Sequence, residues 1–317
     1  MPTVEPSVAG FPVADFPIAD YRARIGRVGV WTGQLDFSPA SVVRDAAREV
    51  EEAGYGALWT GEAVGREVLT AAHLLLGATD SLVVATGIAN IWARDALAMA
   101  AGQLALGEAF PGRFILGIGV SHAPLLDVRG QDYGKPLAFM RAYLDGMDHG
   151  YDVYRAVKSE ATPPRVLAAL GPKMLELAGT RADGAHTYFV PPEHTAKARE
   201  ILGPGKLLIP EQVCVLSTDP STAREIARRH TTSYLRLANY TANLSRFGFA
   251  AEDFADGGND RLVDTICAWG DVEAVAARVR AHLDAGADHV AVQVLVDDRR
   301  GLPRKEWAEL APALLSL

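Results

Sequence analysis

The sequence predicts an α/β fold, a (β/α)8 barrel, on two observations. Eight short β-rich runs alternate with longer helical patterns from Ile25 to the end of the 317-residue chain. Several runs are apolar at consecutive positions (LVVAT, FILGI, VAVQVL), which is typical of parallel strands covered on both faces. A doubly wound sheet, the alternative, usually has fewer strands and a glycine-rich first turn, so the barrel is the better prediction.

The expected strands and helices follow from the local sequence. The strands are residues 28–31, 57–60, 82–88, 114–118, 165–168, 184–189, 207–216 and 289–296. Between the first two, Ser38 and Pro39 predict a helix start and Gly54 its end. Before the last strand, Asp271 predicts a helix cap and Gly286 the matching end.

The chain divides into an arm and one barrel. Residues 1–24 are expected to form an irregular N-terminal arm, because four prolines interrupt the first 21 positions. Residues 25–317 are expected to form a single barrel domain with two long insertions, 121–131 and 231–262, after the fourth and seventh strands. Loops that follow strands carry the active sites of such barrels, so both insertions are expected at the C-terminal face.

Composition excludes several classes of function. The formal net charge of −8 argues against nucleic acid as a partner. The chain has neither the 20 or so uninterrupted apolar residues of a membrane span nor a basic, apolar secretory signal, so a cytoplasmic protein is expected. Cys214 and Cys267 stand far apart in apolar settings, which favours reduced thiols. No metal-ligand spacing occurs, so no metal is expected.

Strand ends supply the candidate catalytic residues, because reactive groups of a barrel lie at the C-terminal ends of its strands. Glu62 directly follows the strand ALWT and could act as an acid or base, or could cap the next segment. His122 ends the run FILGIGVSH and could exchange a proton near neutral pH, or could only hold its neighbours by hydrogen bonds. Trp31 ends the first strand at the same face.

Two further strand ends are expected to contribute to the site through their backbone rather than their side chains. Gly87, in ATGIAN, allows a bulge at the barrel centre, although a routine strand end would look the same. The turn from Ala168 to Pro172 leads into a helix whose free amides, with Lys173, could bind a phosphate, although an ordinary turn between a strand and a helix would look the same. GIGVSH is not a dinucleotide fingerprint, because it lacks the third glycine and is followed by Pro124 rather than a helix.

Taken together, these segments resemble one known family. The runs RVGVWTG, ALWTGE, VATGIANIWARD, GRFILGIGVSHAPLLD and RVLAALGPKMLELAG occur in the same order in the bacterial luciferase-like monooxygenase superfamily. The likeness is strongest to its coenzyme F420-dependent oxidoreductases and covers residues 24–194 most clearly. It implies a luciferase-like TIM barrel, usually a homodimer, that binds a flavin or deazaflavin and a small-molecule substrate at the barrel mouth.

The resemblance also assigns roles to positions. It implies a non-prolyl cis peptide at Gly87 and Ile88 behind the deazaflavin ring, and a tail-phosphate site at the 168–172 turn. With the strand-end residues, the expected cofactor-binding set is Trp31, Glu62, Gly87, Ile88, Asn90, Gly119, Val120, Ser121, Ala168, Ala169, Leu170, Gly171 and Pro172. His122 and Glu62 are the expected catalytic residues.

One departure from the family bears on the reaction. The sugar-phosphate dehydrogenases of this family have an Asp-His pair after the second strand, where this chain has Glu62 and Ala63. The expected function is therefore hydride transfer between coenzyme F420 and another small organic substrate, as in reduction of an unsaturated bond or a carbonyl. An FMN-dependent monooxygenase and a non-catalytic cofactor-binding barrel are the alternatives.

Overall fold

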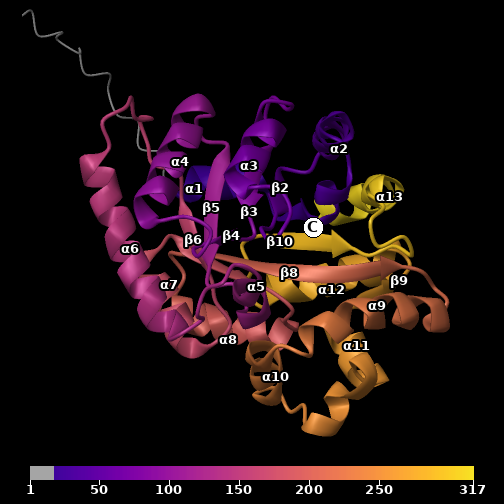
Figure 1. Cartoon of the computed structure of the whole chain (residues 1–317). Coiled ribbons are helices and arrows are strands. Elements are labelled where there is room, and N and C mark those ends of the chain that lie inside the picture. Colours follow the sequence, from indigo (N-terminus) through magenta and orange to yellow (C-terminus); the bar gives the residue numbers. More distant parts are fainter. Residues whose placement is uncertain (1–17) are drawn as a thin grey trace, which may run out of the picture.

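Eight parallel strands close into a barrel in the structure, a computed structural model that describes residues 18–317 (Figure 1). The strands pair in chain order, and the last barrel strand pairs with both the first and the seventh. They are β1 (Val28–Trp31), β2 (Ala57–Thr60), β3 (Val83–Thr86), β5 (Phe114–Gly119), β6 (Arg165–Ala168), β7 (Gly184–Thr187), β8 (Leu207–Leu216) and β10 (Val290–Val294). The predicted (β/α)8 barrel and its eight strands are confirmed.

The third strand is interrupted at the barrel mouth. The predicted run 82–88 is regular only in β3, and its pairing with β5 resumes in the two-residue strand β4 (Ala89–Asn90). In the gap, the Thr86 hydroxyl donates to the Gly117 carbonyl over 2.7 Å and accepts from the Gly117 amide over 2.9 Å. A side chain thus replaces missing ladder bonds, and the Gly87–Ile88 peptide bond that follows is cis.

Helices surround the barrel, as Figure 1 shows. The helix before the last strand starts at the predicted cap, because the Asp271 side chain accepts from the Ala274 amide. The helix between the first two strands starts one residue later than predicted: Pro39 is its cap, without a side-chain hydrogen bond, and Ser38 ends the preceding 3-10 turn. The helices outside the two insertions are α2 (Ala40–Glu52), α3 (Val68–Leu76), α4 (Ala96–Ala109), α6 (Pro136–Val153), α7 (Pro172–Arg181), α8 (Pro192–Leu202), α9 (Pro220–Tyr234), α12 (Val272–Asp284) and α13 (Arg304–Leu315). A short 3-10 turn, η1 (Gln34–Phe37), follows β1.

Part of the expected irregular arm is helical instead. Helix α1 (Ile18–Ile25) covers the last seven residues of the 1–24 segment, and residues 1–17 lie outside the described part of the chain. Tyr21 and Ile25 of α1 are buried in the cluster that fills the barrel interior. Their burial gives the helix a stabilising apolar face. The prediction of an irregular arm rested on the prolines upstream and overlooked this face.

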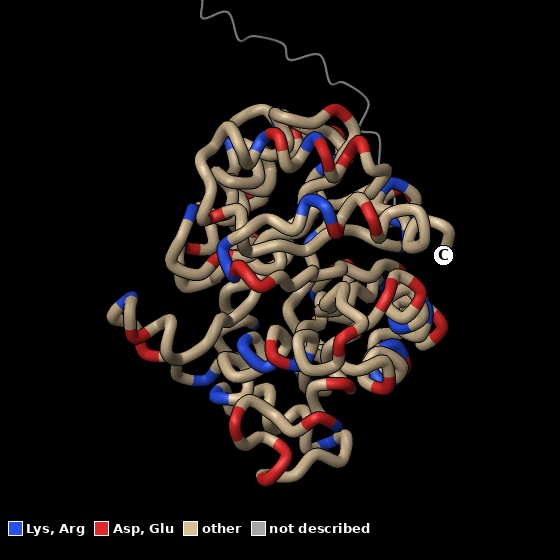
Figure 2. Tube along the Cα trace, turned by 90° about the vertical axis from the view of Figure 1, so that its right-hand side faces the viewer, with Lys and Arg blue, Asp and Glu red and all other residues tan. Residues whose placement is uncertain are grey.

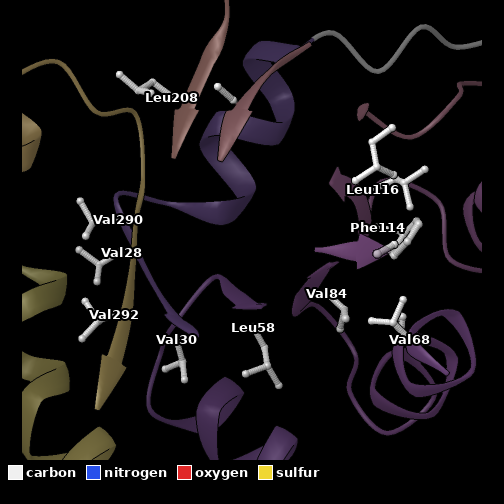
Figure 3. Packing of buried hydrophobic residues seen from close by; sticks show 14 of the residues in the cluster. Val28, Val30, Leu58, Val68, Val84, Phe114, Leu116, Leu208, Val290 and Val292 are labelled. Carbon is white, nitrogen blue, oxygen red and sulfur yellow. The ribbon is translucent and has the colours of Figure 1, made fainter. Parts of the chain in front are cut away.

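The core has two layers because side chains alternate along each strand. Outward-facing residues such as Val28, Val30 and Leu58 pack in the large cluster shared with the surrounding helices (Figure 3). Inward-facing residues such as Trp59, Ile115 and Ile209 form a second cluster inside the barrel. The interior is therefore filled below the mouth, as in other barrels of this type.

Both insertions contain helices. The first holds α5 (Ala123–Val128), so the expectation that no helix follows His122 was wrong: Pro124 lies in the first turn, where proline is tolerated. The second holds α10 (Ala238–Ser245), the 3-10 segment η2 (Ala251–Gly257) and the start of α11 (Asp260–Ile266). Its apolar residues pack over the ends of β7 and β8 in a third cluster.

An unpredicted strand, β9 (Ala268–Gly270), extends the sheet beyond the barrel along β8.

Charged residues of both signs lie interspersed over the outer helices (Figure 2). Within residues 18–317, no helix has the length and hydropathy needed to cross a membrane. The same residues contain no cluster of three or more His, Cys, Asp or Glu side chains arranged to hold a metal ion. Cys214 and Cys267 are buried and unpaired.

Candidate functional site at the barrel mouth

The interrupted third strand is held by backbone contacts from its neighbours. The Trp31 indole nitrogen donates to the Gly87 carbonyl oxygen over 3.1 Å, and the Glu62 amide donates to the Ile88 carbonyl oxygen over 3.0 Å. A Cβ at position 87 would lie 2.7 Å from Trp31 Nε1, so only glycine fits there. The ends of β1, β2 and β3 therefore meet at one point of the mouth.

Glu62 is committed to protein partners. Its side chain, 4% exposed, forms an ion pair with Arg94, and Oε2 accepts from the Asn90 amide over 2.8 Å. Arg94 also donates to Glu67 over 2.6 Å. Both oxygens of the Glu62 carboxylate thus have donors, which fix the segment that follows the bulge.

Asn90 and the loop after β5 complete this side of the mouth. The Asn90 side-chain oxygen accepts from the Trp92 amide over 3.0 Å, whereas its buried Nδ2 has no partner among the described residues. The Val120 carbonyl accepts from Trp92 Nε1 over 3.0 Å. At Gly119, a Cβ would lie 2.8 Å from Ile88 Cγ1 and 2.9 Å from Ala168 Cβ, so β5 is pressed between the bulge and β6.

His122 lies at the start of α5, after a strained residue. Ser121 has a φ of 56°, and its carbonyl oxygen accepts from the Tyr133 hydroxyl over 3.1 Å. The His122 ring centroid lies 5.4 Å from that of Tyr240, and its buried Nδ1 has no partner in the described part of the chain. Burial lowers the pKa of His122, and a hydrogen bond that the ring donates to the Asn239 side chain opposes the shift, so the imidazole is mostly neutral at pH 7.

A row of aromatic rings connects His122 with the bulge. Tyr188 lies 6.4 Å from Tyr240, 5.2 Å from Tyr234 and 5.4 Å from Trp31, measured between ring centroids. Its hydroxyl bonds to the Tyr234 hydroxyl over 2.9 Å and donates to Gln293 Oε1 over 2.7 Å. Burial raises the pKa of Tyr188 well above its usual value, so these hydroxyls remain protonated donors.

Two titratable groups are buried in the barrel below these rings. Glu211 Oε2 accepts from the Phe189 amide over 3.2 Å, Oε1 has no described partner, and burial raises the pKa of the carboxyl to about 8. His186 Nδ1 donates to the Ile209 carbonyl over 2.9 Å, and burial lowers its pKa to about 4. Its Nε2 has no hydrogen-bond partner within residues 18–317 and would lie 3.0 Å from a Cβ at Gly87.

The 168–172 turn forms a second part of the site. It ends at Gly171, the cap of α7, with Pro172 in the first turn, as predicted. The Leu170 carbonyl accepts from His194 Nε2 over 2.9 Å, and Ala169 is buried beneath. A Cβ at Gly171 would lie 3.8 and 3.9 Å from the two terminal nitrogens of Arg246, the residue that follows α10.

This placement of Arg246 has an electrostatic consequence. The N-terminus of a helix carries partial positive charge and free amides, so a guanidinium beside it is unfavourable unless an anion lies between them. Burial lowers the pKa of His194, and the charge of Arg246 lowers it further. The contact described for the guanidinium is with a neutral group, Asn243 Oδ1 at 3.3 Å. The arrangement therefore fits a phosphate or carboxylate at this position.

The structure thus brings the predicted residues together in two groups. Trp31, Glu62, Gly87, Ile88, Asn90 and Gly119 surround the bulge, and Gly119 adjoins Ala168, the first residue of the 168–172 turn. His122 reaches the same mouth through Tyr240 and Tyr188. Val120 and Ser121 contribute backbone carbonyls.

Sequence reasoning missed four residues of this region. Tyr188, Tyr240 and Arg246 are brought to the mouth by long-range packing, and no local pattern marks them. Glu211 did have a signal, since a carboxylate within the apolar run LLIPEQVCVL is unusual for a strand buried on both faces.

Comparison with known proteins supports this description. A 5,10-methylenetetrahydromethanopterin reductase of Methanolobus tindarius is 30% identical over 161 residues, covering 46% of this chain and 49% of that protein. A protein of Mycobacterium tuberculosis provisionally named as a coenzyme F420-dependent oxidoreductase is 28% identical over 195 residues, covering 59% and 52%. The chain spans about half the length of these curated relatives.

The fold has solved counterparts as well. The coenzyme F420 dependent tetrahydromethanopterin reductase from Methanopyrus kandleri superposes with a TM-score of 0.71 at 17% identity, over 90% of this chain and 97% of that one. The sequence model of one family, described as luciferase-like monooxygenase, matches residues 26–289. With the barrel and its interrupted third strand, this match shows that the chain belongs to the luciferase-like monooxygenase family.

Proposed function

We propose that the chain is a coenzyme F420-dependent oxidoreductase acting on a small organic substrate. The observation that carries the proposal is the anion site formed by the start of α7 and Arg246, because F420 bears a phosphate on its tail. The curated relatives are named for methylenetetrahydromethanopterin reduction and for F420-dependent oxidoreduction, which supports the same cofactor.

The residues of the mouth divide the work of binding. In this proposal the turn 168–172 and Arg246 hold the tail phosphate, while Trp31, Gly87, Ile88, Asn90, Gly119, Val120 and Ser121 shape the place for the ring system. When bound, the deazaflavin gives or takes a hydride at its C5. Glu62 contributes to cofactor binding indirectly, because its carboxylate holds Asn90 and Arg94 in place.

His122 is the proposed proton carrier. A mostly neutral imidazole can accept a proton from a substrate hydroxyl, and in the reverse direction the imidazolium returns it. The rings of Tyr240 and Tyr188 exclude water on one side of this group. We further propose that the enzyme is cytoplasmic and that it forms a homodimer. Sedimentation of the purified protein would test the homodimer.

The decisive experiment is a titration of cofactor-free protein with F420 and, separately, with FMN, followed by ligand fluorescence. Gly171→Glu would place a carboxylate beside Arg246 and occupy the anion site, so F420 binding should be lost. Gly205→Glu is the matched control, because Gly205 is exposed and no heavy atom lies within 4 Å of its Cβ position.

The outcomes separate the alternatives. Selective F420 binding that Gly171→Glu abolishes and Gly205→Glu preserves supports the proposal. Selective FMN binding would instead support a monooxygenase, and F420 binding without turnover of any tested substrate would support a non-catalytic barrel.

A further inference from the structure

A small cavity opens beside Trp31, on the edge of the barrel mouth. Its volume is about 240 Å³, and its lining comes from the end of β1, the 3-10 turn η1, helix α9, and the end of β10 with the segment that follows it. Pockets for drug-sized ligands measure roughly 300–1,000 Å³, so this one would hold a smaller molecule. Because Trp31 also contacts Gly87, an occupant of the cavity would adjoin the barrel centre.

The cavity is lined by aromatic rings and by polar atoms that have no hydrogen-bond partner among the described residues. Trp31, Phe37 and Tyr234 supply ring surfaces. Two buried nitrogens of lining residues, His230 Nε2 and Arg229 Nε, have no hydrogen-bond partner among the described residues. Buried polar atoms without hydrogen-bond partners destabilise a folded protein and are rare. They are expected at a binding site, where a ligand supplies the missing partners.

The charges at the rim favour a single anionic group. Arg229 pairs with Asp297 over 2.7 Å, but that carboxylate is 87% exposed, so solvent screens the pair. Arg299, also lining the cavity, has no hydrogen bond or ion pair within residues 18–317. One positive charge therefore remains in excess, which matches a carboxylate better than a dianionic phosphate ester.

We propose that this cavity binds the carboxylate end of a small aromatic acid, with Arg299 and Arg229 at the anion and the rings of Trp31 and Tyr234 against its apolar part. Naming this acid as the substrate rests on the proposed function, whereas the binding itself does not. The neutral state of His230 is consistent with the assignment: burial, reinforced by the charge of Arg299, lowers its pKa to about 3, so it offers a hydrogen bond without a second charge.

Binding of benzoate, benzamide and phenyl phosphate, measured by calorimetry, tests the proposal. Benzoate should bind at least about tenfold more tightly than neutral benzamide and more tightly than phenyl phosphate. Arg299→Ala should weaken benzoate binding about tenfold, Arg299→Lys should restore part of it, and added salt should weaken it. Arg280→Ala is the control, since Arg280 is exposed on α12 and does not line the cavity.

Equal affinity for benzoate and benzamide, or no effect of Arg299→Ala, would overturn the proposal. Tighter binding of phenyl phosphate would overturn the choice of a carboxylate. F420 fluorescence titrations of the same proteins distinguish the two levels of inference. Benzoate binding without F420 binding would refute the proposed function and leave the cavity assignment standing, and the reverse result would refute the cavity alone.

Discussion

The guanidinium of Arg246 lies over Gly171, with its terminal nitrogens 3.8 and 3.9 Å from the position of a Cβ at that glycine. The two residues are 75 positions apart in the sequence, on an insertion and on the cap of α7. Two sources of positive potential, the start of α7 and the guanidinium, therefore converge beside Gly171.

Arg246→Ala is expected to weaken F420 binding about tenfold, because a charge-assisted bond to the phosphate is lost while the α7 amides remain. Fluorescence titration at two salt concentrations measures the effect, and the variant should show the smaller salt dependence. Arg236→Ala, at an exposed arginine of the same insertion, should bind as the unaltered protein does. Unchanged affinity in Arg246→Ala would remove this residue from the phosphate site.

His122→Ala is expected to lower kcat by roughly 100-fold or more and to leave F420 affinity nearly intact, because the proposed role of this residue is to carry the proton and not to hold the cofactor. Steady-state kinetics and fluorescence titration together separate these quantities. His149→Ala, at an exposed position of α6, is the control. A loss of affinity without a loss of kcat would make His122 a binding residue.

Asn239→Ala should move the pH dependence of kcat in a defined direction. The Asn239 side chain raises the pKa of His122 against the effect of burial, so its removal should lower that pKa further. The acidic limb of the profile should shift to lower pH. A profile that does not move would show that this limb reports another group.

Glu62→Gln is expected to lower the free energy of unfolding by about 2 kcal/mol, because it leaves Arg94 buried with a neutral partner. The loss stays below the 3–5 kcal/mol typical of a broken buried pair, since Glu67 still accepts from Arg94. Urea unfolding measures it, with Asp45→Asn in an exposed ion pair as control. Full stability combined with the loss of one limb of the pH–rate profile would assign Glu62 an acid–base role instead.

Glu211→Gln should change how stability depends on pH. The native pKa of about 8 lies above the ordinary value of 4.5, so the native state keeps a proton that the unfolded chain releases between these values. Glu211 therefore contributes its full stability below pH 4.5, and this contribution declines as pH rises toward 8. The amide of Gln keeps an acceptor for the Phe189 amide without this decline.

The difference in unfolding free energy between Glu211→Gln and the unaltered protein should thus grow in favour of the variant from pH 5 to pH 8. Taking the difference cancels the opposite effect of buried neutral histidines such as His282, which destabilise the fold as pH falls. Glu160→Gln, at an exposed glutamate, should show no such trend. A constant difference across the range would mean that Glu211 is ionised in the native state.

The barrel could be predicted because its signals are local. Consecutive apolar positions predict strands covered on both faces, and Gly54 and Gly286, both with positive φ, end helices where expected. In the candidate site, local signals predicted only the backbone features at strand ends, namely the interruption at Gly87 and the helix start at the cap of α7. Arg246 and Tyr240 escape prediction, because their positions depend on how a 32-residue insertion packs over β7 and β8.

Helix α10 also sets a spacing. Asn239 and Tyr240 in its first turn face His122, and Arg246, just past its last turn, faces the cap of α7. Eight residues at about 1.5 Å each separate these ends by roughly 12 Å, and a helix does not stretch. Helix α10 therefore fixes the distance between the residues that face His122 and the residue that faces the cap of α7. Lengthening α10 by one residue would rotate one end by about 100° relative to the other and misalign them, even though every contacting side chain would still be present.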